Sequence, residues 1–322
     1  MTKIKAAPFV PGHVAVLGAG AVGSFFGAML ASAGVAVTLV ARPQHAEAIA
    51  RDGLRVLQGG QEWQAKVNVA TDVSAVSDAD LVLVSVKSPD TTSAAQSLLP
   101  HLRDDARIAS LQNGVDNAAR IGGVLPHPVY AAVVYVGVQM DGPGRVRHLG
   151  RGDLVIGRPR ALVGRGDADR DLRGIASMFV AAGIPCVHAP DIDAALWTKL
   201  AQNCALNAIS ALGRAPYGRM AQISPVRGIV EAAVREVVDV ARADGVLLDA
   251  DALIASTWSL TVAMPKQFSS TSQDVERGKV TEIDALNGFV AERGASLGVP
   301  TPVNATLHAL VKLREPDVSL GA

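Results

Sequence analysis

Three polar side chains recur at every fourth position of an otherwise apolar segment, Leu196–Ile209: Lys199, Asn203 and Asn207. If the segment is a helix, steps of four keep these side chains on nearly one face, within roughly 12 Å of one another. An ammonium group and two amides placed in this way can bind a small, oxygen-rich molecule. The alternative explanation is the solvated edge of a surface helix.

A second set of polar residues lies near the C-terminus. Ser269–Asp274 reads Ser-Ser-Thr-Ser-Gln-Asp, and Thr281–Asp284 reads Thr-Glu-Ile-Asp. Together with a nucleotide-binding motif near the N-terminus, this cluster favours a ligand site over a solvated helix edge.

The nucleotide-binding motif, G-x-G-x-x-G, lies between the apolar run His13–Leu17 and the Ala-rich segment Ala21–Ala33. In a strand, turn and helix, the first glycine permits a tight turn, the second lets a pyrophosphate approach, and the third lets the helix pack on the strand. The N–H groups and positive dipole of the helix N-terminus favour a phosphate. We therefore predict a dinucleotide site that consists of Gly18, Ala19, Gly20, Ala21, Val22 and Gly23.

The end of the second predicted strand indicates which dinucleotide binds. NAD sites usually place an acidic residue there for the ribose 2′-hydroxyl, whereas Val40–Gln44 reads Val-Ala-Arg-Pro-Gln. Arg42 can form a charge-assisted pair with a 2′-phosphate, so we predict NADP(H) in preference to NAD(H). The alternative is an ordinary surface arginine.

Strand-length apolar runs alternate with Ala- and Leu-rich helical segments in the N-terminal part of the chain. The runs are His13–Leu17, Val35–Val40, Leu81–Val86 and Arg107–Leu111. This alternation predicts an α/β fold with a Rossmann-type, doubly wound parallel sheet, and the turn-rich β segments from Tyr130 to Ile156 predict an antiparallel edge. Lys87 and Asn113 follow two of these runs, where such sheets bind their ligands, although ordinary loop residues are equally compatible with the pattern.

From Asp191 to Arg314 no segment resembles a strand, and periodic apolar segments are interrupted by glycine and proline. We therefore predict two domains, a nucleotide-binding domain at 1–190 and an all-helical domain at 191–322.

The composition excludes several classes of protein. Lys+Arg and Asp+Glu balance at 30 each, so bulk charge attracts neither nucleic acid nor an anionic membrane. No apolar run approaches the roughly 18 residues of a membrane helix, and Met1–Pro11 lacks the apolar core of a secretory signal. Cys186 and Cys204 form neither a disulfide framework nor a metal-ligand pattern. We expect a soluble, cytoplasmic protein without a metal; the helical domain would permit a homodimer.

Taken together, these motifs resemble the ketopantoate reductase (2-dehydropantoate 2-reductase) family over nearly the whole chain. The most specific are Leu-Trp-x-Lys-Leu at Leu196–Leu200 and Thr-Glu-Ile-Asp-x-x-Asn-Gly at Thr281–Gly288. The resemblance implies a C-terminal bundle like that of 6-phosphogluconate dehydrogenase. It also implies NADPH-dependent reduction of 2-dehydropantoate to pantoate, a step of pantothenate and coenzyme A biosynthesis. One departure is Gln267, which stands where the family has an asparagine.

The resemblance also implies roles for individual residues. Lys199 would be the general acid, and burial in a cleft between domains would lower the pKa of its amine toward neutrality. Glu282 would be the second catalytic residue, in contact with the lysine or the substrate hydroxyl and with the cofactor. The implied substrate-binding residues are Asn203, Asn207, Gln267 and Ser270. The implied cofactor-binding residues besides the glycine motif are Arg42, Lys87, Asn113 and Glu282.

Other functions have distinguishing features. Short-chain dehydrogenases need Tyr-x-x-x-Lys, and none of Tyr130, Tyr135 and Tyr217 has a lysine four residues later. β-Hydroxyacid dehydrogenases share a helical Lys-x-x-x-Asn, but their Gly-Leu-Gly-x-Met-Gly opening and Ser-Gly-Gly loop are missing. Reduction of another 2-oxo acid stays open, as does a non-catalytic NADP(H)-binding sensor, although a sensor needs neither Lys199 nor Glu282.

Overall fold

The computed structural model describes residues 8–164 and 166–316, and the chain divides into two compact units. The first unit comprises Asp116–Ile192 and the described residues up to Gln112; the second comprises Asn113–Val115 and the described residues from Asp193 onward. The main division between the units falls at 192/193, whereas the sequence analysis placed the domain boundary at 190/191. Asn113–Val115, expected in the N-terminal domain, group with the second unit instead. The expectation about the N-terminal segment concerns mainly residues 1–7, which lie outside the described residues.

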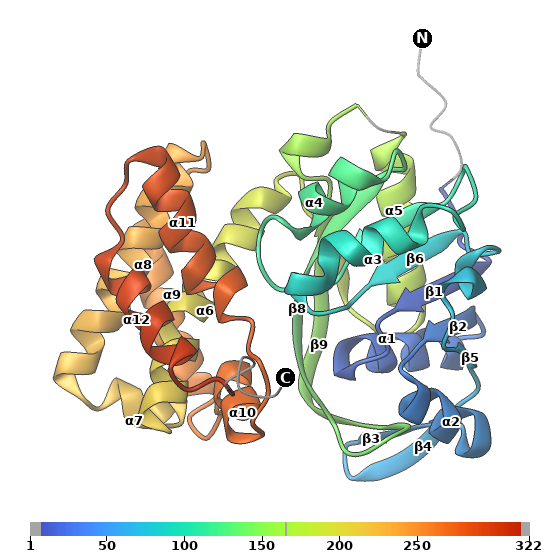
Figure 1. The fold of residues 1–322 in the computed structure, drawn as a ribbon, viewed down its shortest axis with the longest axis horizontal. Helices are drawn as coiled ribbons and strands as arrows, with labels where there is room; N and C mark the ends of the chain where they lie inside the picture. The colour runs from blue at the N-terminus through green and yellow to red at the C-terminus, as the bar shows by residue number, and fades with distance from the viewer. Residues whose placement is uncertain (1–7, 165, 317–322) are drawn as a thin grey trace. The chain divides into compact units, whose positions relative to one another are not determined.

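The first unit is built on a mixed sheet with a parallel, doubly wound centre, which confirms the predicted α/β class (Figure 1). Its parallel strands lie in the order β5-β2-β1-β6-β7-β8, so that the chain moves outward from β1 in both directions. This order creates a switch point between β1 and β6, where such sheets bind ligands beyond the strands' carboxyl ends. The bounds are β1 His13–Leu17, β2 Ala36–Val40, β5 Asn68–Ala70, β6 Leu81–Val84, β7 Arg107–Ser110 and β8 Val129–Met140.

Beyond β8 the sheet continues with strands of mixed direction. β9 (Arg145–Gly157) pairs antiparallel with β8, as expected for the turn-rich segment. β3 (Leu54–Gln58) and β4 (Gln61–Ala65) then form a hairpin at the edge, and β10 (Cys186–His188) pairs with β9. The sequence analysis did not predict the hairpin. Its turn is Gly59-Gly60, with φ of 59° and 81°, the two-residue turn with positive φ that favours a tight hairpin.

Helices cover the sheet of the first unit. α1 and α5 meet through an edge-on contact of Phe26 and Phe179 in the buried core, while α3 and α4 pack together. α2 begins with Pro43, which suits the first turn of a helix because that turn's N–H groups have no helical partner. The bounds are α1 Ala21–Ser32, α2 Pro43–Asp52, α3 Thr91–Leu98, α4 Asn117–Val124 and α5 Ala168–Ala181, with short 3₁₀ helices η1 Val73–Val76, η2 Ser88–Asp90 and η3 Arg160–Leu162.

The described residues of the second unit form helices and connecting loops and no strand, as predicted. Its own apolar core centres on α6 and α8, with Trp197, Leu200 and Val237 among the buried residues. The helices are α6 Ile192–Gly213, α7 Tyr217–Ala221, α8 Ser224–Ala243, α9 Ala250–Ala263, α10 Ser270–Glu276, α11 Asn287–Leu297 and α12 Pro302–Lys312, with η4 at Ile283–Ala285.

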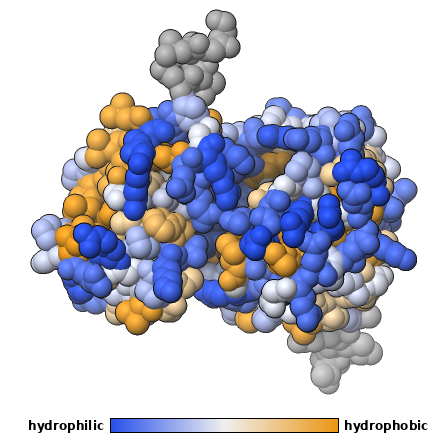
Figure 2. Space-filling view, turned by 90° about the horizontal axis from the view of Figure 1, so that it is seen from below, coloured by the Kyte–Doolittle hydropathy of each residue, from blue (hydrophilic) through white to orange (hydrophobic). Residues whose placement is uncertain are grey.

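The described surface is predominantly hydrophilic on the face shown in Figure 2, where hydrophobic residues form separate patches. Among residues 8–164 and 166–316, no helix combines the length and the apolar character that crossing a bilayer requires.

Candidate active site

The glycine turn follows β1 and is tied to both neighbouring strands. The backbone N–H groups of Gly18 and Ala19 donate to the carbonyl of Val40 at the end of β2, at 3.2 and 3.1 Å. On the other side, Ser85 Oγ donates to the carbonyl of Gly18 at 2.7 Å. The turn that leads into α1 is therefore held by hydrogen bonds to the protein on both sides.

The three motif glycines differ in what a side chain would meet. A Cβ on Gly18 would lie 2.7 Å from the backbone nitrogen of Val86, and one on Gly23 would lie 2.4 Å from the carbonyl oxygen of Gly18. Gly18 also has a φ of 97°, which favours glycine. A Cβ on Gly20, in contrast, would have nothing within 4 Å. The fold itself requires Gly18 and Gly23, whereas the open space at Gly20 suits the close approach of a pyrophosphate.

The topology brings Arg42 and Lys87 to the same edge of the sheet as the glycine turn. Arg42 follows β2 and directly precedes α2, and Lys87 follows β6; these strands flank β1 on its two sides. Both side chains are exposed. Within residues 8–164 and 166–316, the guanidinium of Arg42 forms no hydrogen bond or ion pair. The sequence alone placed each residue at a strand end, and the strand order shows that the two strands flank β1.

In the second unit, an amide bridges the two predicted catalytic groups. Lys199 Nζ donates to Asn113 Oδ1 at 2.9 Å, and Asn113 Nδ2 donates to Glu282 Oε2 at 3.1 Å. The amide's orientation follows from chemistry, because an ammonium group only donates and a carboxylate only accepts. Asn113, predicted as a cofactor residue, therefore lies between Lys199 and Glu282. All three side chains are half-buried.

The three polar side chains predicted to share one face of α6 differ in their burial. Asn203, one turn after Lys199, is half-buried, and its side chain forms no hydrogen bond with the described residues. Asn207 is only 3% exposed and accepts a 3.4 Å hydrogen bond from the Tyr217 hydroxyl. The amide of Asn203 thus has its hydrogen-bonding capacity open, whereas that of Asn207 is held by Tyr217.

Ser269 fixes the start of α10 against α6. Its hydroxyl donates to the carbonyl of Asn207 at 3.1 Å and accepts from the backbone N–H of Ser272 at 3.0 Å, so that it caps the helix. Its own N–H donates to Ser210 Oγ at 3.2 Å. Ser270, the predicted substrate residue, is the exposed first residue of this anchored helix.

Gln267 makes local contacts. Its side-chain amide donates to the backbone carbonyl of Phe268 at 2.8 Å, and the backbone carbonyl of Gln267 accepts from the Tyr217 N–H at 3.0 Å. The side chain that departs from the family's asparagine is thus engaged with its neighbour in the chain.

The residues on either side of Glu282 are held by the end of the chain. Glu315 Oε1 accepts from both the N–H and the hydroxyl of Thr281, at 2.8 and 2.6 Å. Asp284 accepts from His308 Nε2 at 2.6 Å and from Lys312 Nζ at 2.9 Å. Glu282 therefore projects from a short segment anchored on both sides.

We expect Glu315→Gln to destabilise the helical unit by about 1–2 kcal/mol near neutral pH, since two hydrogen bonds to a charged group are weakened. Burial by itself raises the pKa of Glu315, but the hydrogen bonds from Lys312 and Thr281 bring it below its ordinary value. This stabilisation is present above the unfolded pKa of about 4.3 and is lost as pH falls through the lower folded pKa. Urea unfolding followed by tryptophan fluorescence at several pH values measures it; an equal difference at neutral and strongly acidic pH would contradict this account.

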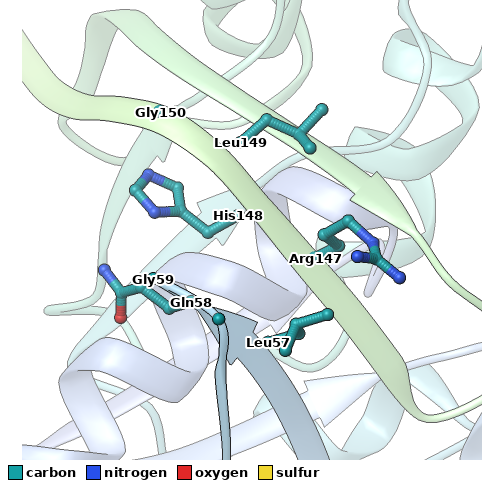
Figure 3. A pocket seen from close by; sticks show the side chains of 8 residues that line it. Leu57, Gln58, Gly59, Arg147, His148, Leu149 and Gly150 are labelled. Carbon is teal, nitrogen blue, oxygen red and sulfur yellow. The ribbon is translucent and has the colours of Figure 1, made fainter.

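A surface depression elsewhere holds none of the predicted residues. It lies in the first unit and is lined by Leu57–Gly60, which comprise the end of β3 and the turn after it, and by Arg147–Gly150 of β9 (Figure 3). Arg147 is paired with Asp141, and the imidazole of His148 stacks on Phe25. These side chains have structural partners, so the depression adds nothing to the candidate site.

The sequence analysis missed Ser85 and Tyr217, which contact candidate site residues, and it included Ser269 in a polar cluster without predicting its role as a helix cap. Ser269 carried a signal, because a serine directly before a helix is a preferred cap. Ser85 and Tyr217 gave none, since each acts through a partner distant in sequence or in an unpredicted helix.

Comparisons with known proteins cover both units. The family model described as "Ketopantoate reductase PanE/ApbA" matches residues 14–161, and "Ketopantoate reductase PanE/ApbA C terminal" matches residues 191–315. A 2-dehydropantoate 2-reductase from Halobacterium salinarum is 37% identical over 312 residues, which are 95% of this chain and 99% of that protein.

Two solved structures are similar over nearly the whole chain. A PanE/ApbA family ketopantoate reductase from Ralstonia eutropha is 47% identical, with a TM-score of 0.86 over 94% of this chain and 98% of that one. A D-mandelate dehydrogenase in ternary complex with NADH and anilino(oxo)acetate is 25% identical, with a TM-score of 0.87 and the same coverage.

Proposed function

The chain belongs to the ketopantoate reductase family of oxidoreductases, and we propose that it reduces 2-dehydropantoate to pantoate with NADPH, with Lys199 as the general acid. The observation that carries this proposal is the hydrogen-bonded series Lys199, Asn113 and Glu282. These hydrogen bonds support the proposal because they join an ammonium group, an amide and a carboxylate within the helical unit.

Lys199 meets the negative charge that develops on the ketone oxygen. Its ammonium group stabilises that oxygen and transfers a proton to it, so that the C=O bond becomes a C–OH group. The hydrogen bond to Asn113 Oδ1 restricts the direction of the ammonium group. General acid catalysis of this kind contributes roughly 10²–10⁴-fold to a rate.

Glu282 acts on Lys199 through the amide of Asn113. The carboxylate accepts from Asn113 Nδ2, which polarises the amide and makes its oxygen a better acceptor for the lysine. In this role Glu282 favours the charged lysine that the reaction requires. Asn203, whose amide is open, orients the oxygens of the substrate together with the exposed hydroxyl of Ser270, while Asn207 shapes the same helix face through Tyr217.

The residues of the first unit fit a nicotinamide dinucleotide. Gly20 leaves room for a pyrophosphate at the N-terminus of α1, where backbone N–H groups and the helix dipole favour negative charge. Arg42 and Lys87 supply positive charge at the neighbouring strand ends. When bound, NADPH supplies the hydride that the ketone carbon accepts.

The direct test is NADPH oxidation by the purified protein with 2-dehydropantoate, beside a panel of other 2-oxo acids and an NADH control. Selective turnover of 2-dehydropantoate supports the proposal. Binding of NADPH without turnover of any acid would contradict it and favour a sensor that keeps the fold without the chemistry.

A second candidate is reduction of a 2-oxo acid with an aromatic side group. The D-mandelate dehydrogenase whose fold matches this chain was solved with NADH and anilino(oxo)acetate, and Gln267 replaces the family's asparagine near Ser270. Phenylglyoxylate belongs in the panel for this reason. Preference for that acid over 2-dehydropantoate would keep Lys199 as the acid and change the substrate.

We expect Arg42→Ala to raise the dissociation constant of NADPH by roughly 10- to 100-fold, because a charge-assisted hydrogen bond to the 2′-phosphate is lost. The dissociation constant of NADH should change little, since NADH lacks that phosphate. Isothermal titration calorimetry of both nucleotides measures the two effects. Arg51→Ala, an exposed arginine at the other end of α2, is the matched control. An unchanged preference in Arg42→Ala would remove Arg42 from this role.

A further inference from the structure

His45, in the first turn of α2, has hydrogen bonds at both nitrogens of its ring. The backbone N–H of Gly144, in the turn before β9, donates to Nδ1 at 2.7 Å. Nε2 lies 3.2 Å from Ser24 Oγ on α1. Ser24 Oγ in turn donates to the carbonyl of Ala19, within the glycine turn, at 3.0 Å. Ser24 is fully buried and His45 half-buried.

The direction of each hydrogen bond in this series is fixed by chemistry. A backbone N–H can only donate, so Nδ1 accepts and carries no proton. The proton of the neutral ring is then on Nε2, so Nε2 donates a hydrogen bond to Ser24 Oγ, and the Ser24 hydroxyl in turn donates one to the Ala19 carbonyl. Burial lowers the pKa of His45 from its ordinary value, which favours the neutral ring that this arrangement needs.

The series ends on the peptide group between Ala19 and Gly20, the part of the glycine turn that would hold the cofactor's pyrophosphate. Ala19 and Gly20 share that group: its carbonyl accepts from Ser24, and its N–H donates to the carbonyl of Gly18 at 2.8 Å. Both ends of the peptide are therefore held, which fixes its plane.

The other end of the series leads to Arg42. The N–H groups of His45 and Ala46 donate to the carbonyl of Arg42, at 3.0 and 2.9 Å. His45 is thus joined to Arg42 through its backbone and to the glycine turn through its side chain. Since the guanidinium of Arg42 has no hydrogen-bonding partner among the described residues, its position depends on this backbone.

We propose that His45 is a positioning residue for cofactor selection, which holds the Arg42 turn at a fixed distance from the glycine turn. A 2′-phosphate and a pyrophosphate of one nucleotide can then engage both at once. NADH engages only the glycine turn and gains little from the fixed distance. The inference rests on the proposed function, in particular on Arg42 as the partner of the 2′-phosphate.

Two conservative variants separate positioning from simple packing. His45→Gln retains an N–H donor near the place of Nε2, toward Ser24, whereas His45→Asn retains an acceptor near the place of Nδ1, toward Gly144. His45→Leu retains neither. Ser24→Ala removes the middle of the series from the other helix and leaves the imidazole in place. His101→Gln, in the turn that follows α3, is the control histidine.

Calorimetric dissociation constants for NADPH and NADH and a melting temperature would be measured for each protein. We expect His45→Leu and Ser24→Ala to lower the NADPH-over-NADH preference about tenfold, mainly by weakening NADPH, the equivalent of about one charge-assisted hydrogen bond. We expect His45→Gln to keep most of the preference, His45→Asn to lose it, and His101→Gln to match the wild type.

An unchanged preference in folded His45→Leu or Ser24→Ala overturns the inference, as does equal weakening of both nucleotides, which a merely structural role would produce. If His45→Leu does not fold, the comparison of His45→Gln with Ser24→Ala decides in the same way. Wild-type protein that binds neither nucleotide overturns the proposed function instead, so the two failures are distinguishable.

Discussion

Replacement of Lys199 by alanine is expected to lower kcat by roughly 10³-fold while the affinity for NADPH stays nearly unchanged. The lysine hydrogen-bonds to Asn113 in the helical unit, whereas the residues predicted to hold the phosphates of the cofactor, Gly18–Gly23, Arg42 and Lys87, belong to the other unit. Loss of the ammonium group removes both the proton donor and the charge that stabilises the ketone oxygen in the transition state. Single-turnover oxidation of NADPH with saturating 2-oxo acid measures the chemical step, and calorimetry measures the affinity.

Two further variants show whether charge or proton transfer matters. Lys199→Arg keeps a cation, but a guanidinium is a poor acid because its pKa exceeds about 12. The kcat of Lys199→Arg should therefore lie within about tenfold of the kcat of Lys199→Ala. The difference between the two reflects the positive charge that arginine restores. Lys66→Ala removes an exposed lysine of the first unit and should behave as wild type. Near-normal turnover by Lys199→Ala would remove Lys199 as the general acid.

Adding the same methyl group at Gly23 and at Gly20 is expected to have two different results. At Gly23 the methyl would lie 2.4 Å from both the Gly18 carbonyl oxygen and Ser85 Oγ, so the turn or α1 must move. Overpacking of this kind costs typically about 1–3 kcal/mol, and we expect Gly23→Ala to lower the melting temperature and to weaken NADPH binding at least 100-fold. At Gly20 the methyl meets no protein atom within 4 Å, and the φ of −74° accepts alanine.

Gly20→Ala should therefore keep the wild-type melting temperature and still bind NADPH at least tenfold more weakly, because the methyl occupies the space of the pyrophosphate. Thermal unfolding by circular dichroism and calorimetric titration measure the two effects on the same samples. Gly34→Ala would be a poor control, because Gly34 has a φ of 87°. Gly228→Ala, in α8 of the other unit, is the matched control, because Gly228 has open space around it and no positive φ. Wild-type affinity in Gly20→Ala would mean that no pyrophosphate lies at this turn.

The sequence predicted the centre of the fold because local patterns there agree with the final structure. The run His13–Leu17 is buried along nearly its whole length, as expected for a strand covered on both faces, and it coincides with β1. The hairpin of β3 and β4 was missed although Gly59-Gly60 is a turn signal. Its strands are short and partly exposed, with Gln61 and Glu62 open to solvent, so no clear apolar pattern marks them.

Candidate residues of the helical unit could be named from the sequence, but the hydrogen bonds among them could not. Lys199 and Asn203 follow from helical spacing, and Glu282 from the motif around it. Asn113 comes 86 positions before Lys199 and 169 before Glu282, and no local pattern specifies a contact over such a distance. The sequence therefore assigned it to the cofactor by its place after a strand, while the structure shows its bonds to the two catalytic candidates.

The assignment of Asn113–Val115 to the helical unit bears on how this protein could be recombined. The chain passes between the units at 112/113, 115/116 and 192/193, so the helical unit is not encoded by one continuous stretch of gene. A chimera joined at 192/193 would carry Lys199 and Glu282 into a new host without the asparagine that links them. Exchange of helical units between relatives would therefore succeed only where the donor's segment equivalent to Asn113–Val115 is transferred together with its helices. The alternative is a host that already has an amide at the position of Asn113.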